Sequence, residues 1–154
     1  MPQIPYDSTL LDRTNRRIVG ELASDGRVSM AELGRRVGLS APAVAERVQR
    51  LERRGVITGY RAELDPRALG YPLTAFVRVK PALRQLDKVR ELAVETPEVV
   101  ECHRVTGEDC FVLKVCLASI DALGEILDRF LVYGETTTSI IQASPLARRD
   151  PPVT

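Results

Sequence analysis

The sequence predicts an α+β protein with two domains, and three observations carry this prediction. Apolar residues recur with helical periodicity over the first sixty positions, strand and helix signals alternate from about residue 73, and Gly and Pro punctuate the stretch between. The second half reads βαββαβ, the ferredoxin-like order. We therefore place a helix-turn-helix domain at 1–60, a linker strand and hinge at 61–72, a ferredoxin-like domain at 73–146 and a tail at 147–154.

The first sixty residues predict three helices. Asp12 can cap the first helix, and the Asp25-Gly26 turn ends it. Each helix carries an apolar stripe at the spacing of one face. The stripes are Leu11, Ile18, Val19 and Leu22 in the first helix, Met30, Leu33 and Val37 in the second, and Val44, Val48 and Leu51 in the third.

The second and third helices are joined by a short glycine-containing turn. Ser29 and Glu32 fit a capping box, in which each side chain satisfies the other residue's backbone N–H. Gly38 suits the left-handed position that ends a helix, and Ser40 can cap the next helix. Gly34 has no side chain, so the following helix can cross closely. This conjunction favours a DNA-binding helix-turn-helix unit over a plain helical bundle.

The second half opens with a β-rich run at 73–80, followed by a helix that stops before Pro97. Two further β-rich runs, 99–105 and 110–117, flank a turn at Gly107. Ser119 can cap a second helix, and residues 136–143 return to a strand. The ferredoxin-like fold places both helices on one face of the sheet.

Alternate residues of the run 110–117 divide into two faces. One face is wholly apolar and suits the helices, whereas the other is mixed but too apolar for a free surface. We expect the mixed face to pack against another subunit; a solvated face is the alternative. The apolar face holds Phe111, Leu113, Val115 and Leu117, and the mixed face holds Cys110, Val112, Lys114 and Cys116.

The distribution of charge is more informative than the net charge of +1. Residues 27–54 carry seven Arg against three Glu, a local charge of +4, whereas residues 61–154 carry 12 basic and 14 acidic side chains. A basic segment on a nearly neutral protein indicates contact with phosphates. A solvated helix face is the alternative explanation.

Other classes of protein fit less well. The three cysteines match no common metal or redox spacing, so we expect reduced thiols and no metal. No apolar stretch of about 18 residues predicts a membrane span, and the N-terminus does not resemble a secretory signal, so we expect a cytoplasmic protein. An enzyme is the main rival class. However, His103 and Cys102 are neighbours on a strand and point to opposite faces, and no phosphate-binding glycine loop is present.

Residues 39–60, LSAPAVAERVQRLERRGVITGY, resemble the recognition segment of the Lrp/AsnC, or feast/famine, family of transcription regulators. The similarity runs from about residue 11 to about residue 145 and includes ECHRVTGEDCFVLKV and TTTSIIQ. It implies a winged helix-turn-helix domain and a ferredoxin-like effector-binding domain, the RAM domain. It also implies dimers formed through the effector domains, further assembly to tetramers, octamers or hexadecamers, and an amino acid as the usual effector. No cofactor is implied.

Two positions depart from the family pattern. Asn15 stands where a second Asp is usual in the first helix, at little expected cost because Asn still accepts hydrogen bonds. Cys110 stands at the usual acidic position of the effector loop, and a thiol cannot pair with an ammonium group as a carboxylate does. Either Asp109 or Glu108 compensates, or the effector is not an amino acid held in that way.

We expect the third helix to lie in the major groove of double-stranded DNA, on a roughly palindromic operator bound by a homodimer. Arg47 can donate two hydrogen bonds to guanine, or can instead reach a phosphate or an acidic neighbour. Ser29 at a helix N-terminus can present N–H groups to phosphate or act purely as a cap. The candidates for base contact are Ser40, Ala41, Ala43 and Arg47, and those for phosphate contact are Ser29, Arg36, Arg50 and Arg53.

The turn after the second β-rich run is the candidate effector site. Its backbone N–H groups can bind a carboxylate, and Gly107 allows close approach. An ordinary β-turn and a Thr-rich strand are the alternative. The candidate residues are Thr106, Gly107, Glu108, Asp109 and Cys110 in the loop, with Thr136, Thr138 and Ser139 on the last strand.

The sequence therefore predicts a sequence-specific transcription regulator whose assembly and DNA affinity respond to a small effector. An architectural DNA-binding protein without an effector is the alternative, and a small enzyme is the third class considered.

Overall fold

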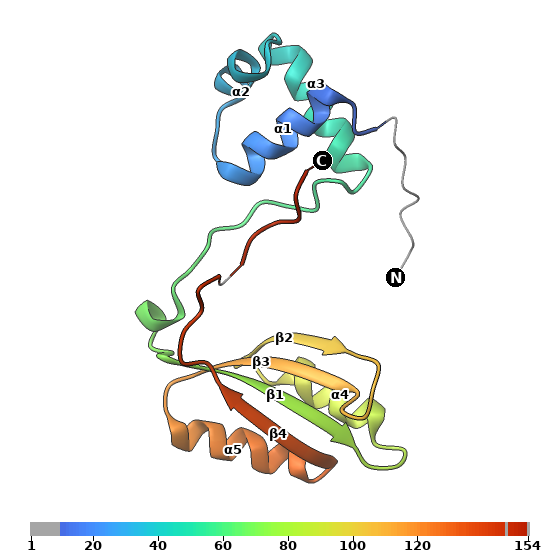
Figure 1. Cartoon of the computed structure of the whole chain (residues 1–154), viewed down its shortest axis with the longest axis vertical. Helices are drawn as coiled ribbons and strands as arrows, with labels where there is room; N and C mark the ends of the chain where they lie inside the picture. Colours follow the sequence, from blue (N-terminus) through green and yellow to red (C-terminus); the bar gives the residue numbers. More distant parts are fainter. Residues whose placement is uncertain (1–9, 147, 154) are drawn as a thin grey trace. The chain divides into compact units, whose positions relative to one another are not determined.

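A computed structural model describes residues 10–146 and 148–153 of the chain (Figure 1). It consists of two compact units, one built from residues 10–62 together with 148–153, and the other from residues 63–146. No helix in the described part of the chain combines the length and the apolar character needed to cross a bilayer.

The N-terminal unit contains three helices, α1 (Arg13–Ser24), α2 (Met30–Val37) and α3 (Ala41–Arg53). As expected, the side chains of Asp12, Ser29 and Ser40 cap them by accepting hydrogen bonds from the backbone N–H three residues on. The predicted stripes converge into one core whose buried members include Ile18, Leu33, Val37, Val44, Val48 and Leu51.

The turn between α2 and α3 depends on two glycines. Gly38 has a φ of 79°, the left-handed conformation that favours glycine, and its N–H donates to the carbonyl of Gly34. A Cβ atom on Gly34 would lie 2.6 Å from the backbone oxygen of Leu39. The chain after the turn therefore packs directly on Gly34, as the sequence predicted.

Two expectations, one for this unit and one for the linker that follows it, are not met. Ser29 accepts from the N–H of Glu32, but the carboxylate of Glu32 pairs with Arg35 and Arg36 instead of returning to Ser29, so only half of the capping box forms. The linker strand expected at 61–72, and any wing strand before it, do not form. Residues 54–65 hold no strand, and Pro66–Leu69 form a 3-10 helix. A strand needs a hydrogen-bonded neighbour, and none of the described residues provides one here.

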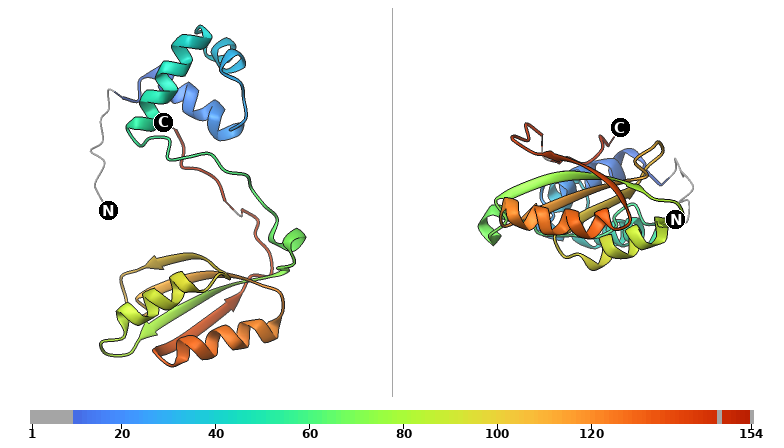
Figure 2. Two further views of the ribbon diagram at one scale, coloured as in Figure 1. Left: turned by 180° about the vertical axis from the view of Figure 1, so that it is seen from behind. Right: turned by 90° about the horizontal axis from the view of Figure 1, so that it is seen from below.

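The C-terminal unit has the predicted βαββαβ order: β1 (Leu73–Pro81), α4 (Leu86–Glu95), β2 (Val99–Arg104), β3 (Phe111–Leu117), α5 (Ile120–Leu131) and β4 (Gly134–Ile140). The four strands form one antiparallel sheet in the order β2-β3-β1-β4. Both helices cover the same face of the sheet (Figures 1 and 2). The last strand begins two residues earlier and ends three residues earlier than the expected 136–143.

The core of this unit lies between the sheet and the helices. It contains the predicted apolar face of β3, together with Val77 and Val79 of β1, Val89 of α4 and Phe130 of α5. The opposite face of the sheet, which we call the outer face, has no covering layer among the described residues of this unit. Phe76, on the outer face of β1, leaves 41% of its surface exposed.

Candidate DNA-binding and effector sites

The residues that α3 buries in the core determine which of its residues face outward. Val44, Val48 and Leu51 are buried, so the residues half a turn away point outward. Ala41, Ala43 and Arg47 lie on the flanks and are half-buried, whereas Ser40 at the cap is exposed. The exposed positions along α3 are Pro42, Glu46, Gln49, Arg50, Glu52 and Arg53.

Arg47 is tied to the start of α1. Its Nη1 donates to Asp12 Oδ2 and to Asn15 Oδ1, each at 2.9 Å. Asn15 is only 4% exposed, and its Nδ2 donates to the carbonyl of Leu10 at 2.7 Å. The amide that replaces the usual carboxylate therefore has both ends satisfied, which fits the low cost expected for this departure. Of the roles considered for Arg47, contact with an acidic neighbour is the one that this geometry matches, and the neighbour is Asp12.

An Arg47→Ala substitution is expected to destabilise the N-terminal unit by about 1–3 kcal/mol, because the buried oxygen of Asn15 loses its donor. The backbone N–H of Asn15 and the side chain of Arg47 hold the pKa of Asp12 below its ordinary value of 3.8. This carboxylate therefore contributes stability above about pH 3.8, and the contribution is lost as pH falls through the lower folded-state pKa.

The measurement is hydrogen exchange of α1 and α3 amides at neutral and acidic pH. Arg53→Ala is the matched control, because Arg53 lies exposed on the same helix with no ion pair among the described residues. Equal exchange rates in both variants at neutral pH would remove the bridging role of Arg47.

Arg36 is also engaged within the protein. Its guanidinium pairs with Glu32 at 2.8 Å and with Glu21 of α1 at 2.9 Å. The hydrogen bond to Glu32 and then that to Glu21 raise the pKa of Arg36 above its ordinary value. The guanidinium group that was expected to contact a phosphate is therefore bound by two carboxylates. The ion pair with Glu21 links α1 to α2.

Arg50 and Arg53 are exposed and have no ion pair within the described chain. They lie near the C-terminal end of α3 on its outward side. The side-chain oxygen of Ser29 accepts a hydrogen bond from the N–H of Glu32 at 3.2 Å. This is the capping role that the sequence offered as the alternative to phosphate contact. Of the four phosphate candidates, the two on α3 are therefore those with available guanidinium groups.

The candidates named from sequence did not include Glu46 and Gln49. Both are exposed on the outward side of α3. The signal was present, since the spacing of Val44, Val48 and Leu51 places positions 46 and 49 on the opposite face.

The loop between β2 and β3 forms a tight, strained turn. The N–H of Val105 donates to the carbonyl of Cys110 at 2.7 Å, and the N–H of Phe111 donates to the carbonyl of Asp109 at 2.5 Å. Cys110, at the centre of the second turn, has a φ of 52°, an unusual conformation for a residue with a side chain. Gly107 has a φ of 113°. Backbone strain of this kind is concentrated at functional sites.

Two acidic residues of this loop face basic residues of the central strand β1. Asp109 Oδ2 lies 3.7 Å from Arg78 Nε, and Glu108 Oε2 lies 4.0 Å from Lys80 Nζ. All four side chains are at least 40% exposed. The loop therefore places loosely paired charges of both signs at one end of the outer face.

The register of β4 separates the three candidate residues on that strand. Thr136 pairs with Val79 and Thr138 with Val77, both buried, so these threonines share the face that the helices cover. Ser139 pairs with Phe76 and lies on the outer face. Thr137, which pairs with Arg78, shares that outer face although the sequence did not single it out. Thr136 and Thr138 are therefore placed away from Arg78 and Lys80.

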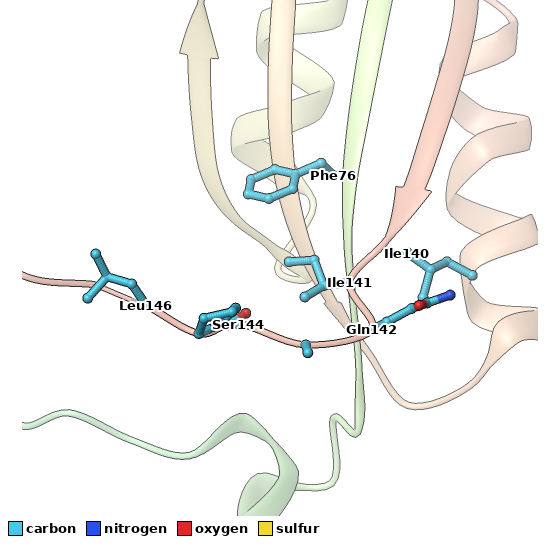
Figure 3. Close-up of a pocket in the computed structure, with 8 residues that line it drawn as sticks. Phe76, Ile140, Ile141, Gln142, Ser144 and Leu146 are labelled. Atoms are coloured by element: carbon cyan, nitrogen blue, oxygen red, sulfur yellow. The ribbon is translucent and has the colours of Figure 1, made fainter.

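The outer face also carries hollows. One, of about 610 Å³, is lined by Phe76 and the chain from Ile140 to Leu146. Figure 3 shows the side chains of Phe76 and Ile141 pointing to the same side, with Ile140 directed away. A second, of about 290 Å³, is lined by Leu64, Pro66, Leu69, Tyr71, Pro97, Glu98, Val100 and Cys116.

Among the described residues, His103 and Cys102 do not form a nucleophile–base pair. His103 pairs with Val112 and Cys102 with Leu113, so the two side chains lie on opposite faces, as expected. Burial raises the pKa of the Cys102 thiol, which lowers its reactivity. Within the described residues, no group of His, Cys, Asp or Glu side chains could hold a metal ion.

Comparison with known proteins accounts for both units. The family model for the AsnC-type helix-turn-helix domain matches residues 11–52, and that for the Lrp/AsnC ligand binding domain matches residues 74–151. The HTH-type transcriptional regulator LrpA of Mycobacterium tuberculosis is 45% identical over 129 residues, which are 83% of this chain and 86% of that protein. The leucine-responsive regulatory protein of Escherichia coli K12 is 38% identical over 138 residues, covering 85% and 84% of the two chains.

Solved structures agree in fold. The structure of LrpC from Bacillus subtilis has a TM-score of 0.85 at 32% identity and covers 90% of this chain and 99% of that one. A feast or famine regulatory protein from M. tuberculosis, complexed with L-methionine, has a TM-score of 0.85 at 40% identity and covers 92% and 99%. The protein thus joins a DNA-binding helix-turn-helix domain to a ligand-binding domain, and it belongs to the Lrp/AsnC family of transcriptional regulators.

Proposed function

We propose that this regulator responds to an α-amino acid bound at the loop between β2 and β3, and that binding changes its assembly and its affinity for DNA. The observation that carries the proposal is the loose pair of Arg78 and Asp109, at 3.7 Å and partly exposed. A guanidinium and a carboxylate complement the two charged ends of an amino acid. The complex of a similar regulator with L-methionine supports this class of effector.

In this proposal Asp109 supplies the carboxylate that Cys110 cannot. Its carbonyl already closes the strained turn, which fixes the backbone from which its side chain extends. Gly107 lets the effector approach the loop backbone closely. The proposed effector residues are Thr106, Gly107, Glu108, Asp109, Cys110 and Ser139, whereas Thr136 and Thr138 face the helices and are left out.

On DNA, we propose that α3 enters the major groove. Ser40, Ala41 and Ala43 at its N-terminal end lie near the bases, and Arg50 and Arg53 contact phosphates. Arg47 and Arg36 stabilise the N-terminal unit instead, because carboxylates and an amide oxygen of the same unit bind their guanidinium groups.

Assembly is proposed to use the outer face of the sheet. This face carries a partly exposed Phe76 and adjoins two hollows with apolar walls, and a second copy would cover them. A twofold dimer presents two α3 helices to a roughly palindromic operator, and further copies can build a tetramer or octamer. We also propose a cytoplasmic location, where a DNA-binding regulator has access to its operator.

The test is a titration of the full chain with each of the twenty amino acids. Particle mass by light scattering and affinity for a duplex selected from a random pool are both followed. We expect one or a few amino acids to change both quantities, by no more than their differential affinity for the assembly states.

Asp109→Asn should abolish that response while DNA binding without effector persists. Asp128→Asn, an exposed Asp on α5, is the matched control and should respond normally. Retention of DNA binding with no response to any amino acid would instead support an architectural protein without an effector.

A further inference from the structure

Glu46 is a carboxylate on the outward side of α3, a helix whose other exposed carboxylate, Glu52, accepts a hydrogen bond from the Tyr60 hydroxyl. It is exposed, and it lies one or two turns before Arg50 and Arg53 on the same side of α3. A carboxylate brought near DNA phosphates is repelled by them. On the face proposed to meet the major groove, a hydrogen-bond donor that reaches this carboxylate would offset the repulsion.

No residue in the part of the chain that the structure describes supplies such a donor. Arg47, the neighbouring cation, is held by Asp12 and Asn15. Arg50 is spaced four residues from Glu46, the spacing of a helical ion pair, but no such pair forms within the described chain. Among the described residues, Glu46 is therefore an exposed acceptor with no ion-pair partner.

The base edges offer few donors to such a group. In the major groove, guanine presents only acceptors, thymine presents an acceptor and a methyl group, and adenine places an acceptor beside its amino group. Cytosine presents an amino donor alone, and Glu or Asp is the side chain that accepts from it. A carboxylate at this position would therefore favour cytosine and disfavour guanine on the contacted strand.

We propose that Glu46 is a specificity-determining residue that selects cytosine at one base pair of each half-site by accepting a hydrogen bond from its amino group. This rests on the proposed entry of α3 into the major groove. Glu46 would make a favourable contact with cytosine and an unfavourable one with the other bases. It would therefore increase the preference for the selected sequence and lower the affinity for unselected DNA.

The experiment selects duplexes from a random pool with the full-length wild type, Glu46→Gln and Glu125→Gln. Glu125 is an exposed glutamate on α5, so its variant changes the net charge equally without altering α3. We expect one cytosine position per half-site in the wild type and Glu125→Gln pools. In the Glu46→Gln pool that preference should fall by about tenfold, with tighter binding to unselected DNA.

A second measurement uses fixed duplexes that carry C·G or T·A at the selected position. Wild type should prefer C·G by about tenfold, and Glu46→Ala should bind the two within about twofold, so the effects couple in a double-mutant cycle. An unchanged preference in both Glu46 variants, or an equal change in Glu125→Gln, would overturn the assignment. If the wild type selects no duplex at all, the proposed docking of α3 fails instead.

Discussion

A Gly34→Ala variant is expected to lose about 1–3 kcal/mol of stability in the N-terminal unit, the range typical of overpacking. The added Cβ atom would lie 2.6 Å from the carbonyl oxygen of Leu39, and this neighbour is backbone that cannot turn aside as a side chain would. The same carbonyl belongs to the turn that sets the direction of α3. DNA affinity should therefore fall together with stability.

Gly20→Ala is the matched control. Gly20 lies within α1 and a Cβ atom there meets nothing within 4 Å, so the same chemical change should stabilise the unit by roughly 0.5–1 kcal/mol through helix propensity. Hydrogen exchange of α2 and α3 amides measures the effect, and amides of β1 and β3 in the same molecule provide an internal reference. Gly34→Ala should speed exchange by roughly 5–150-fold; slower exchange in that variant would contradict the close packing.

A variant with Arg50→Gln and Arg53→Gln is expected to bind duplex DNA on the order of 10–100-fold more weakly at 0.1 M salt. Both guanidinium groups are exposed on α3 and unpaired within the described chain, so each is available to neutralise one phosphate. The slope of log affinity against log salt should fall by about 2, and the loss should be the same for all sequences.

The control variant carries Arg84→Gln and Arg129→Gln, which remove the same charge from exposed positions of the C-terminal unit. Its salt slope should equal that of the wild type. An unaltered slope in the α3 variant would exclude phosphate contact by these two arginines, whereas equal losses in both variants would point to the overall field of the protein instead.

The parts of the fold that sequence predicted are those governed by local rules. Asp12, Ser29, Ser40 and Ser119 were named as helix caps because a cap depends on the three residues that follow it, and all four accept the expected hydrogen bond. The two faces of β3 were likewise readable, because alternation along one strand needs no partner.

For four of the predicted site residues, the surroundings depend on contacts distant in sequence. Arg47 reaches Asp12 across 35 positions, and Arg36 reaches Glu21 across 15, so an outward helical position did not reveal that these guanidinium groups are occupied. For Thr136 and Thr138 the deciding fact is the register of β4 against β1, since a shift of one residue exchanges the two faces of a strand. The strand predicted at 61–72 does not form for a related reason. A sequence that favours an extended backbone does not by itself provide a neighbouring strand to pair with.

The edge strand β2 bears on how copies of this chain can add to one another. The row of backbone groups along β2 is open on one side, yet this strand carries Glu101, His103 and Arg104, and its register shifts between Val99 and Glu101. Charged side chains and an irregular register both discourage an incoming strand from extending a sheet. Addition of a further strand at β2, one route to fibres, is therefore resisted, which agrees with the proposed association through the outer face.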